Sequence, residues 1–169
     1  RACQAVPRDH GVGIARALAI DPMARNAHYN LALALEAAGD NKGAAAEYRL
    51  EIENHEHAFK SRFNLARLLG SEGDRPGQVR ELKTMVEDNP DFTMGQFYLA
   101  KALLDSGDLP GAEAEALRAL KQVPDHYYAP LGHYVLADIY AATGRASLAE
   151  QAVQLGRKLE ARKLPPPPS

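Results

Sequence analysis

The sequence predicts an all-α solenoid built from antiparallel helix pairs. One segment of eleven residues recurs as NLALALEAAGD, NLARLLGSEGD and YLAKALLDSGD, with a looser copy, VLADIYAATGR. The glycines near the ends of these copies, Gly39, Gly73, Gly107 and Gly144, lie 34, 34 and 37 residues apart. A fixed period of this length is the signature of a protein made of stacked repeats.

Each copy begins as an amphipathic helix. In the first copy Leu31, Leu35 and Ala38 fall at helical spacing, and the other copies repeat the pattern. A Gly-Asp pair such as Gly39-Asp40 closes the first three copies. Glycine adopts the left-handed backbone conformation that ends a helix, and the aspartate caps the next helix. Each unit is therefore predicted to be a helix, a tight turn and a second helix.

The second helix of each unit carries small residues along one face. In the segment AEAEALRALKQVP these residues are Ala112, Ala116 and Ala119, which permit a close approach between two helices. Pro124 then marks the end of the helix, because proline cannot continue one.

The repeated unit resembles the tetratricopeptide repeat, whose 34-residue pattern combines Leu and Ala in the first helix with Ala, an aromatic residue, Ala and a closing proline. In the first full copy the matching residues are Leu31, Ala32, Leu35, Ala44 and Tyr48. The resemblance covers nearly the whole chain. Gln78 stands where the repeat usually has a small alanine, so its side chain must point outward or find a polar partner.

The resemblance implies six segments. They are the second helix of a truncated preceding repeat (1–24), four repeats (25–58, 59–92, 93–126 and 127–163) and a Pro-rich tail (164–169). The fourth repeat contains a three-residue insertion around residues 127–130. It ends in a polar capping helix, because the last repeat of a solenoid needs a solvated outer face. The chain begins inside a repeat and without methionine, so we expect it to be a piece of a longer polypeptide.

Composition and charge argue against several classes of function. The 20 basic and 22 acidic residues give a net charge of -2, so no long-range field favours nucleic acid or an anionic membrane. No apolar run reaches the roughly 18 residues that a membrane span needs. The single cysteine, Cys3, allows neither an intrachain disulfide nor a thiolate metal cluster, and the compartment stays open.

No motif of a catalytic or cofactor-binding site occurs in the sequence. His55-Glu56-His57 is the densest group of metal-ligand residues, but positions two apart on a helix face different directions and no third ligand is adjacent. We interpret it as an exposed turn at a helix end. Residues 125–128, with His133 and Tyr134, form an aromatic patch or fill the gap at the insertion, while His10 and His28 are isolated. We predict no enzyme, no cofactor and no metal site.

The resemblance implies binding instead. In relatives the repeats coil into a right-handed superhelix whose concave face, lined by the first helices, holds an extended peptide or a partner helix. By this resemblance the concave residues are Asn26, Tyr29, Asn30, Leu33, Lys60, Phe63, Asn64, Arg67, Met94, Phe97, Tyr98, Lys101, Leu131, Tyr134, Val135 and Asp138. The row of aromatic side chains favours this assignment, because a helix seldom exposes an aromatic residue at the same place in every repeat without a ligand.

Two features of this face bear on the ligand. Asn30 and Asn64 lie one period apart, and a carboxamide both donates and accepts hydrogen bonds. Such a pair either forms hydrogen bonds with a peptide backbone or is simply exposed to solvent on the helix surface. Lys60, Arg67 and Lys101 form a basic patch suited to a ligand with an acidic residue beside an aromatic one. The residues with which some relatives clamp a C-terminal carboxylate are incomplete here.

The sequence therefore predicts a protein–protein interaction scaffold that binds a peptide or partner segment in the concave groove and has no catalysis of its own. The expected partner is a protein or peptide, with no nucleic acid and no membrane. One alternative is self-association, with a homodimer formed through the exposed solenoid ends. Another is a C-terminal tail that positions an upstream enzyme, because APLGHYVLADIYAATGR is similar to the closing repeat of bacterial tetratricopeptide tails attached to sulfatase-like hydrolases.

Overall fold

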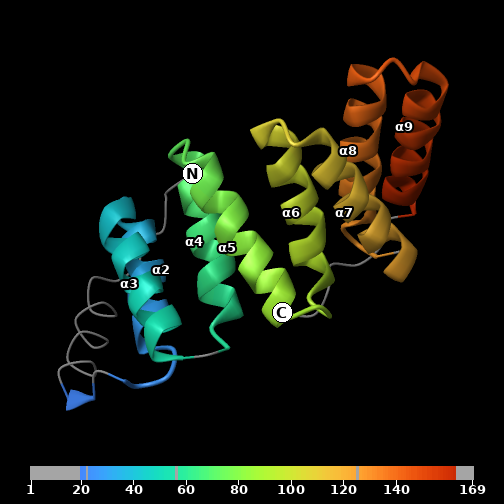
Figure 1. Cartoon of the computed structure of the whole chain (residues 1–169). Helices are drawn as coiled ribbons and strands as arrows, with labels where there is room; N and C mark the ends of the chain where they lie inside the picture. Colours follow the sequence, from blue (N-terminus) through green and yellow to red (C-terminus); the bar gives the residue numbers. More distant parts are fainter. Residues whose placement is uncertain (1–19, 22, 56, 125, 163–169) are drawn as a thin grey trace, which may run out of the picture. The chain divides into compact units, whose positions relative to one another are not determined.

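The computed structural model describes residues 20–162 except 22, 56 and 125, and within them the chain forms eight α-helices and no strand (Figure 1). The helices are α2 (Ala27–Ala37), α3 (Asn41–Asn54), α4 (Phe59–Ser71), α5 (Arg75–Asp88), α6 (Thr93–Ser106), α7 (Leu109–Gln122), α8 (Ala129–Ala142) and α9 (Ala146–Ala161). The all-α prediction is confirmed. None of the described helices has the length and apolar character needed to span a lipid bilayer.

The chain divides into two compact units, which we call unit 1 (Arg1–Gly73) and unit 2 (Asp74–Ser169). Unit 1 contains α2 to α4, and unit 2 contains α5 to α9. The predicted helix of a truncated repeat, Cys3, His10 and the Pro-rich tail lie outside the described residues.

The Gly-Asp turns form as the sequence predicts. Gly39, Gly73 and Gly107 have φ angles of 84°, 87° and 88°, the left-handed conformation that ends the preceding helix. In each case the next aspartate accepts a hydrogen bond from the backbone N–H three residues later. At Asp74 the donor is Gly77, at 2.9 Å. A Cβ atom on Gly77 would lie 2.3 Å from Asp74 Oδ2, so only glycine admits this cap without a shift of the carboxylate.

The fourth turn, at Gly144 and Arg145, is stabilised in a different way. Arg145 stands where the other turns have aspartate, and it makes no cap. Its two terminal nitrogens instead donate to the two carboxylate oxygens of Glu113 in α7, both at 2.8 Å. The guanidinium also lies over the Tyr140 ring, 4.4 Å from its centroid. This turn is therefore fixed by a bidentate ion pair to another helix.

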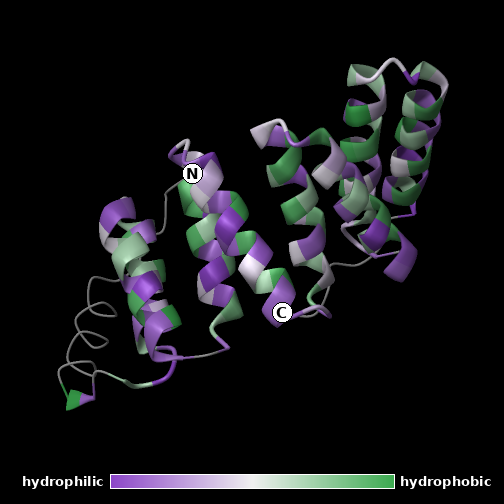
Figure 2. Ribbon diagram, viewed as in Figure 1, coloured by the Kyte–Doolittle hydropathy of each residue, from purple (hydrophilic) through white to green (hydrophobic). Residues whose placement is uncertain are grey.

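In unit 1 the apolar faces of three helices meet in one core. α2 packs against α3, and α3 packs against α4. The buried residues of this core are Ala32, Ala44, Ala45, Tyr48, Leu65, Leu68 and Leu69. Figure 2 shows the corresponding amphipathic colouring, with hydrophobic and hydrophilic residues alternating along each helix. The α2–α3 pair and α4 are thereby held together by side-chain packing.

In unit 2 small residues allow close helix packing. Ala112, Ala116 and Ala119 of α7 are completely buried, as the small-residue face predicts. α7 packs against both α6 and α8, and α8 packs against α9. Gln78 of α5 finds a polar partner, because its Oε1 accepts a hydrogen bond from Arg75 at 3.1 Å. The departure from the small alanine is accommodated in this way.

Candidate peptide-binding surface

The predicted concave residues of unit 1 lie on α2 and α4. We call the surface made by Asn26, Tyr29, Asn30, Leu33, Lys60, Phe63, Asn64 and Arg67 the α2–α4 face. Asn30 and Lys60 are exposed, Leu33 is 39% exposed, and Asn64 is half-buried. Among the described residues, neither the Asn30 nor the Asn64 carboxamide has a hydrogen-bond partner. Both side chains therefore have donors and acceptors available for a ligand.

Arg67 is less available than the sequence suggests. Its guanidinium forms an ion pair with Glu36 of α2, which joins the C-terminal parts of α2 and α4. Glu36 also accepts a hydrogen bond from the buried Tyr48 hydroxyl, at 2.6 Å. Burial, followed by this hydrogen bond to Glu36, raises the pKa of the Tyr48 phenol far above its usual range. Of the two cations that unit 1 contributes to the predicted basic patch, Lys60 and Arg67, only Lys60 is without an ion pair among the described residues.

The start of α2 is capped from α3 and not by its own side chain. Asn26 precedes the helix with a φ angle of 62°, and it is the one non-glycine residue with positive φ in the described part of the chain. Asparagine tolerates this left-handed conformation better than most residues. The buried Glu51 carboxylate accepts hydrogen bonds from the backbone N–H of Asn26, at 2.9 Å, and of Tyr29, at 3.2 Å. It thereby satisfies amides that the first helical turn would leave unpaired.

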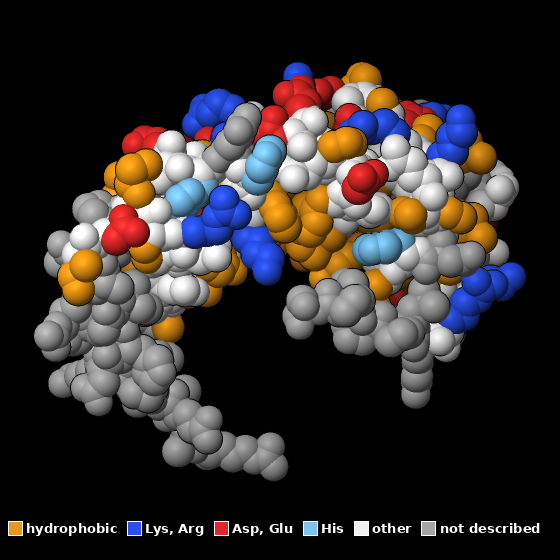
Figure 3. All heavy atoms as spheres, turned by 90° about the horizontal axis from the view of Figure 1, so that it is seen from below, with side chains coloured by type: hydrophobic (Ala, Val, Ile, Leu, Met, Phe, Trp, Pro, Cys, Tyr) orange, Lys and Arg blue, Asp and Glu red, His pale blue; other side chains and the backbone are white. Residues whose placement is uncertain are grey.

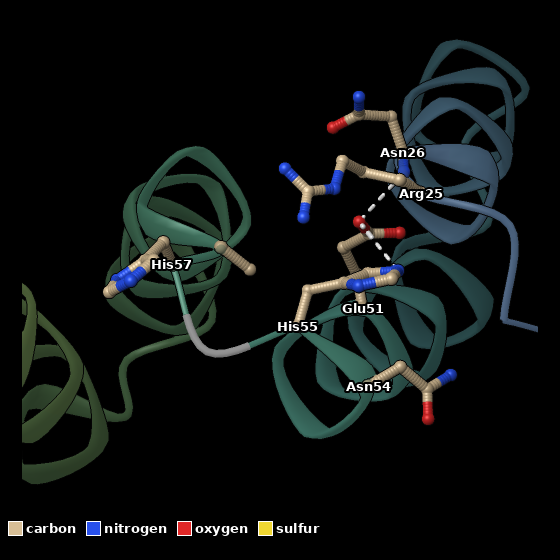
Figure 4. Close-up of a pocket in the computed structure, with 7 residues that line it drawn as sticks. Arg25, Asn26, Glu51, Asn54, His55 and His57 are labelled. Atoms are coloured by element: carbon tan, nitrogen blue, oxygen red, sulfur yellow. Dashed lines mark hydrogen bonds and ion pairs between the residues drawn. The ribbon is translucent and has the colours of Figure 1, made fainter.

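A pocket of about 380 Å³ opens where α3 ends and where α2 and α4 begin. It is lined by Arg25, Asn26, Glu51, Asn54, His55, His57 and Ala58. Figure 4 shows Arg25 extending from the start of α2 toward the turn between α3 and α4, with Glu51 and His55 beneath it. Figure 3, which views the molecule from the end at which α3 stops and α4 starts, shows histidine side chains close to basic ones at this surface.

His55 and His57 lie on the walls of this pocket. His55 Nε2 is buried, lies 3.6 Å from Glu51 Oε1 and has no hydrogen-bond partner in the described structure. His57 is exposed and lies in the turn before α4. Within the described residues, no group of three or more His, Cys, Asp or Glu side chains is arranged to hold a metal ion. His28, expected to be isolated, is instead buried with its Nδ1 2.6 Å from Glu47 Oε2.

The structure corrects the predicted groove residues of unit 2, and Phe97 is the clearest case. Phe97 is 0% exposed and packs with Ala119, Ala129 and Leu159 in the core. Its ring is also stacked on His126, with the ring centroids 6.1 Å apart. The inserted segment before α8 and the end of α9 cover the position that the repeat pattern would leave open. Phe97 is therefore a core residue and not part of an exposed aromatic row.

Val135 is a second groove prediction in unit 2 that needs correction, whereas Tyr134 and Lys101 stay predictions. Val135 is buried in the core formed by α6, α7, α8 and α9. Tyr134 faces α9, where its hydroxyl donates to Glu160 at 2.7 Å and its ring packs against Gly156. Lys101 forms an ion pair with Asp105 one turn along α6, so its charge is partly neutralised. Met94 and Tyr98 are half-buried and Asp138 is exposed.

The insertion before α8 forms an aromatic cluster. The Tyr128 ring lies 5.9 Å from that of Tyr98 and 5.7 Å from that of His126, measured between centroids. Burial lowers the pKa of His126 and of His133, which favours neutral imidazoles at pH 7. This cluster fills the gap at the insertion, as one of the two sequence-based interpretations proposed, while Tyr127 remains 42% exposed.

Sequence reasoning missed Arg25, Glu36 and Glu51. The pairs Glu36–Arg67 and Glu51–Asn26 join residues 31 and 25 positions apart. Glu51 left one weak signal in the sequence, because it lies between the apolar residues Leu50 and Ile52. Arg25 left no signal in the sequence, since a single arginine before a helix is common.

Comparison with known proteins identifies the fold. A family model described as the tetratricopeptide repeat matches residues 14–59, 63–127 and 97–159. No curated protein sequence matches the chain. Among solved structures, that of MamA has a TM-score of 0.80 at 12% identity, covering 90% of this chain and 88% of that chain. The structure of YrrB, described as a TPR protein with an unusual peptide-binding site, has a TM-score of 0.77 at 18% identity, with 92% and 83% covered.

A third structure, of Pseudomonas aeruginosa pilF, has a TM-score of 0.74 at 20% identity and covers 89% of this chain and 67% of that chain. At these identities the likeness concerns the fold alone. Together with the family match, it shows that the chain is an all-α solenoid of helical repeats.

Proposed function

Because the chain belongs to the tetratricopeptide repeat family, whose fold is a scaffold for protein–protein interaction, we propose that it binds an extended peptide segment of a partner protein on the α2–α4 face. In unit 2 the candidates for ligand contact include Met94, Tyr98, Lys101, Tyr134 and Asp138. The chain contributes binding and no reaction of its own.

The carboxamides of Asn30 and Asn64 carry this proposal. They occupy equivalent positions on α2 and α4, and neither has a hydrogen-bond partner among the described residues. An extended peptide presents one N–H and one C=O per residue, and a carboxamide can pair with both. Two such side chains fix the direction of a peptide backbone without selecting its side chains.

The neighbouring residues supply the remaining contact area. Leu33 is a large apolar residue that is 39% exposed, and Lys60 offers a cation at the surface. Since α2 and α4 are joined by the Glu36–Arg67 ion pair and by a shared core, the face is preformed and a ligand orders little on binding. The peptide-binding site reported for YrrB, a structural relative of low identity, is consistent with this mode of action.

Peptide selection tests the proposal. Random nonapeptides would be selected on the immobilised chain and then measured against an Asn30→Ala/Asn64→Ala variant. Asn41→Ala is the matched control, because Asn41 is an exposed asparagine at the start of α3 and outside the α2–α4 face. We expect the double variant to bind selected peptides at least tenfold more weakly and the control to bind them like the wild type. Equal binding by all three would refute a site on the α2–α4 face.

Self-association and a role as the tail of an upstream enzyme stay predictions. Light scattering over a concentration range would test the first, since a constant mass equal to one chain would contradict it. An upstream reading frame without a catalytic domain would contradict the second.

A further inference from the structure

The pocket between the start of α2 and the end of α3 is lined by Arg25, whose guanidinium makes no ion pair with the other described residues that line it. Arg25 is exposed and has no partner among the described residues. The Glu51 carboxylate lines the same pocket, yet no ion pair forms between the two side chains. Figure 4 shows the Arg25 guanidinium extending away from the start of α2, toward the side on which His57 lies, with no dashed line to it.

Glu51 does not make this a site for cations. Its side chain is 3% exposed, and its two oxygens accept from the backbone amides of Asn26 and Tyr29. A cationic ligand would have to displace these hydrogen bonds and would meet the charge of Arg25 first. An apolar ligand is also disfavoured, because Ala58 is the only apolar residue among the described residues that line the pocket.

The groups left at the opening include several hydrogen-bond donors. Arg25 presents five N–H donors in a planar fork that matches the oxygens of a carboxylate or a phosphate. The Asn26 carboxamide makes no cap hydrogen bond and lies beside Arg25, as Figure 4 shows. Asn26 has a left-handed backbone conformation, its backbone N–H donates to Glu51, and its side chain is not used as a cap.

We propose that this pocket binds an oxyanion, a carboxylate or a phosphate, carried by the peptide that occupies the α2–α4 face. The inference rests on the proposed function, because Asn26 belongs to both surfaces and Ala58 is the N-cap residue of α4, two residues before Lys60. The acidic group sets the register of the peptide, while Asn30 and Asn64 hold its backbone.

The first arm of the test uses small anions and needs no peptide. Sodium propionate and inorganic phosphate would be titrated into the full chain at constant ionic strength, with the amide signal of Asn26 and the ring signals of His57 followed by NMR. We expect saturable shifts, with a dissociation constant at least tenfold higher for Arg25→Gln. The control, Arg49→Gln, removes an exposed arginine from α3 and should stay within twofold of the wild type. The ratio of the two affinities distinguishes a carboxylate site from a phosphate site.

The second arm uses the selected peptides. Replacing their acidic residue by the corresponding amide, or removing a phosphate, should weaken binding to the wild type at least fivefold and leave binding to Arg25→Gln unchanged. Non-saturable shifts, or equal anion affinity in the Arg25 and Arg49 variants, would overturn the inference. Peptides that depend on Asn30 and Asn64 but are indifferent to Arg25 would overturn it while leaving the proposed function intact. Anion binding without any such peptide would remove the proposed function and the peptide-borne ligand with it.

Discussion

Replacing Phe97 by alanine separates a core role from a groove role for this residue. The position repeats Tyr29 and Phe63 along the chain, and the repeat pattern places it on the concave surface. In the structure, however, Phe97 is completely buried and packs with Ala119 and Ala129. The two locations predict very different consequences for stability.

The magnitude follows from burial. Truncation of a buried phenylalanine to alanine costs about 3–5 kcal/mol, because the ring loses its contacts and leaves a cavity. For a protein of this size, each kcal/mol shifts Tm by about 2–4 °C, so Phe97→Ala should lower Tm by about 6–20 °C. An exposed aromatic side chain away from any such feature would change the free energy of unfolding by about 0.5 kcal/mol or less.

Thermal unfolding followed by circular dichroism measures this difference. Leu33→Ala is the control for an exposed position and should lower the stability by less than about 1 kcal/mol. Phe97→Leu keeps most of the volume and should cost about 1.5 kcal/mol or less, which provides a folded variant for comparison. If Phe97→Ala unfolded at the same temperature as Leu33→Ala, the buried position of the ring would be wrong.

Two further predictions concern the turns between helices. Asp74→Ala removes the hydrogen bond from Gly77 and should lower the stability by about 1 kcal/mol in urea titration, whereas an unchanged midpoint would mean that the bond does not cap α5. For Glu113, the hydrogen bond from Arg145 holds the pKa below its usual range. The folded pKa thus lies below the unfolded value of about 4.3, so the stabilisation is present above that pH and is lost as the pH falls through the folded pKa. Glu113→Gln should be less stable than the wild type at pH 7 and approach it in acid, and a difference in Tm that is constant with pH would refute this.

The features that were predictable from sequence are local. A Gly-Asp turn depends on residues within one helical turn, so the pair Gly73-Asp74 identifies both the end of one helix and the cap of the next. The helix periodicity is equally local. Small residues such as Ala116 also reveal a close helix contact, because few other environments require them at that spacing.

The features that escaped prediction depend on which distant segments meet. Phe97 is covered by the segment before α8 and by Leu159, and neither follows from the period of the repeat. Arg67 looks like a free cation until α2 places Glu36 beside it. The same limit applies to Glu51, whose role becomes visible only when α3 packs against the start of α2. A repeat pattern predicts the helices of each repeat. It does not predict which side chains a neighbouring helix buries.

The replacement of an aspartate cap by Arg145 at the last turn has a consequence for folding kinetics. The Asp74 cap joins residues three apart and can form with its own helix, whereas the Glu113–Arg145 pair joins residues 32 apart and requires α7 and α8 to be docked. Loss of the local cap should therefore slow folding, and loss of the distant pair should mainly speed unfolding. Stopped-flow rates for Asp74→Ala and Glu113→Gln would place the two turns at different points along the folding pathway.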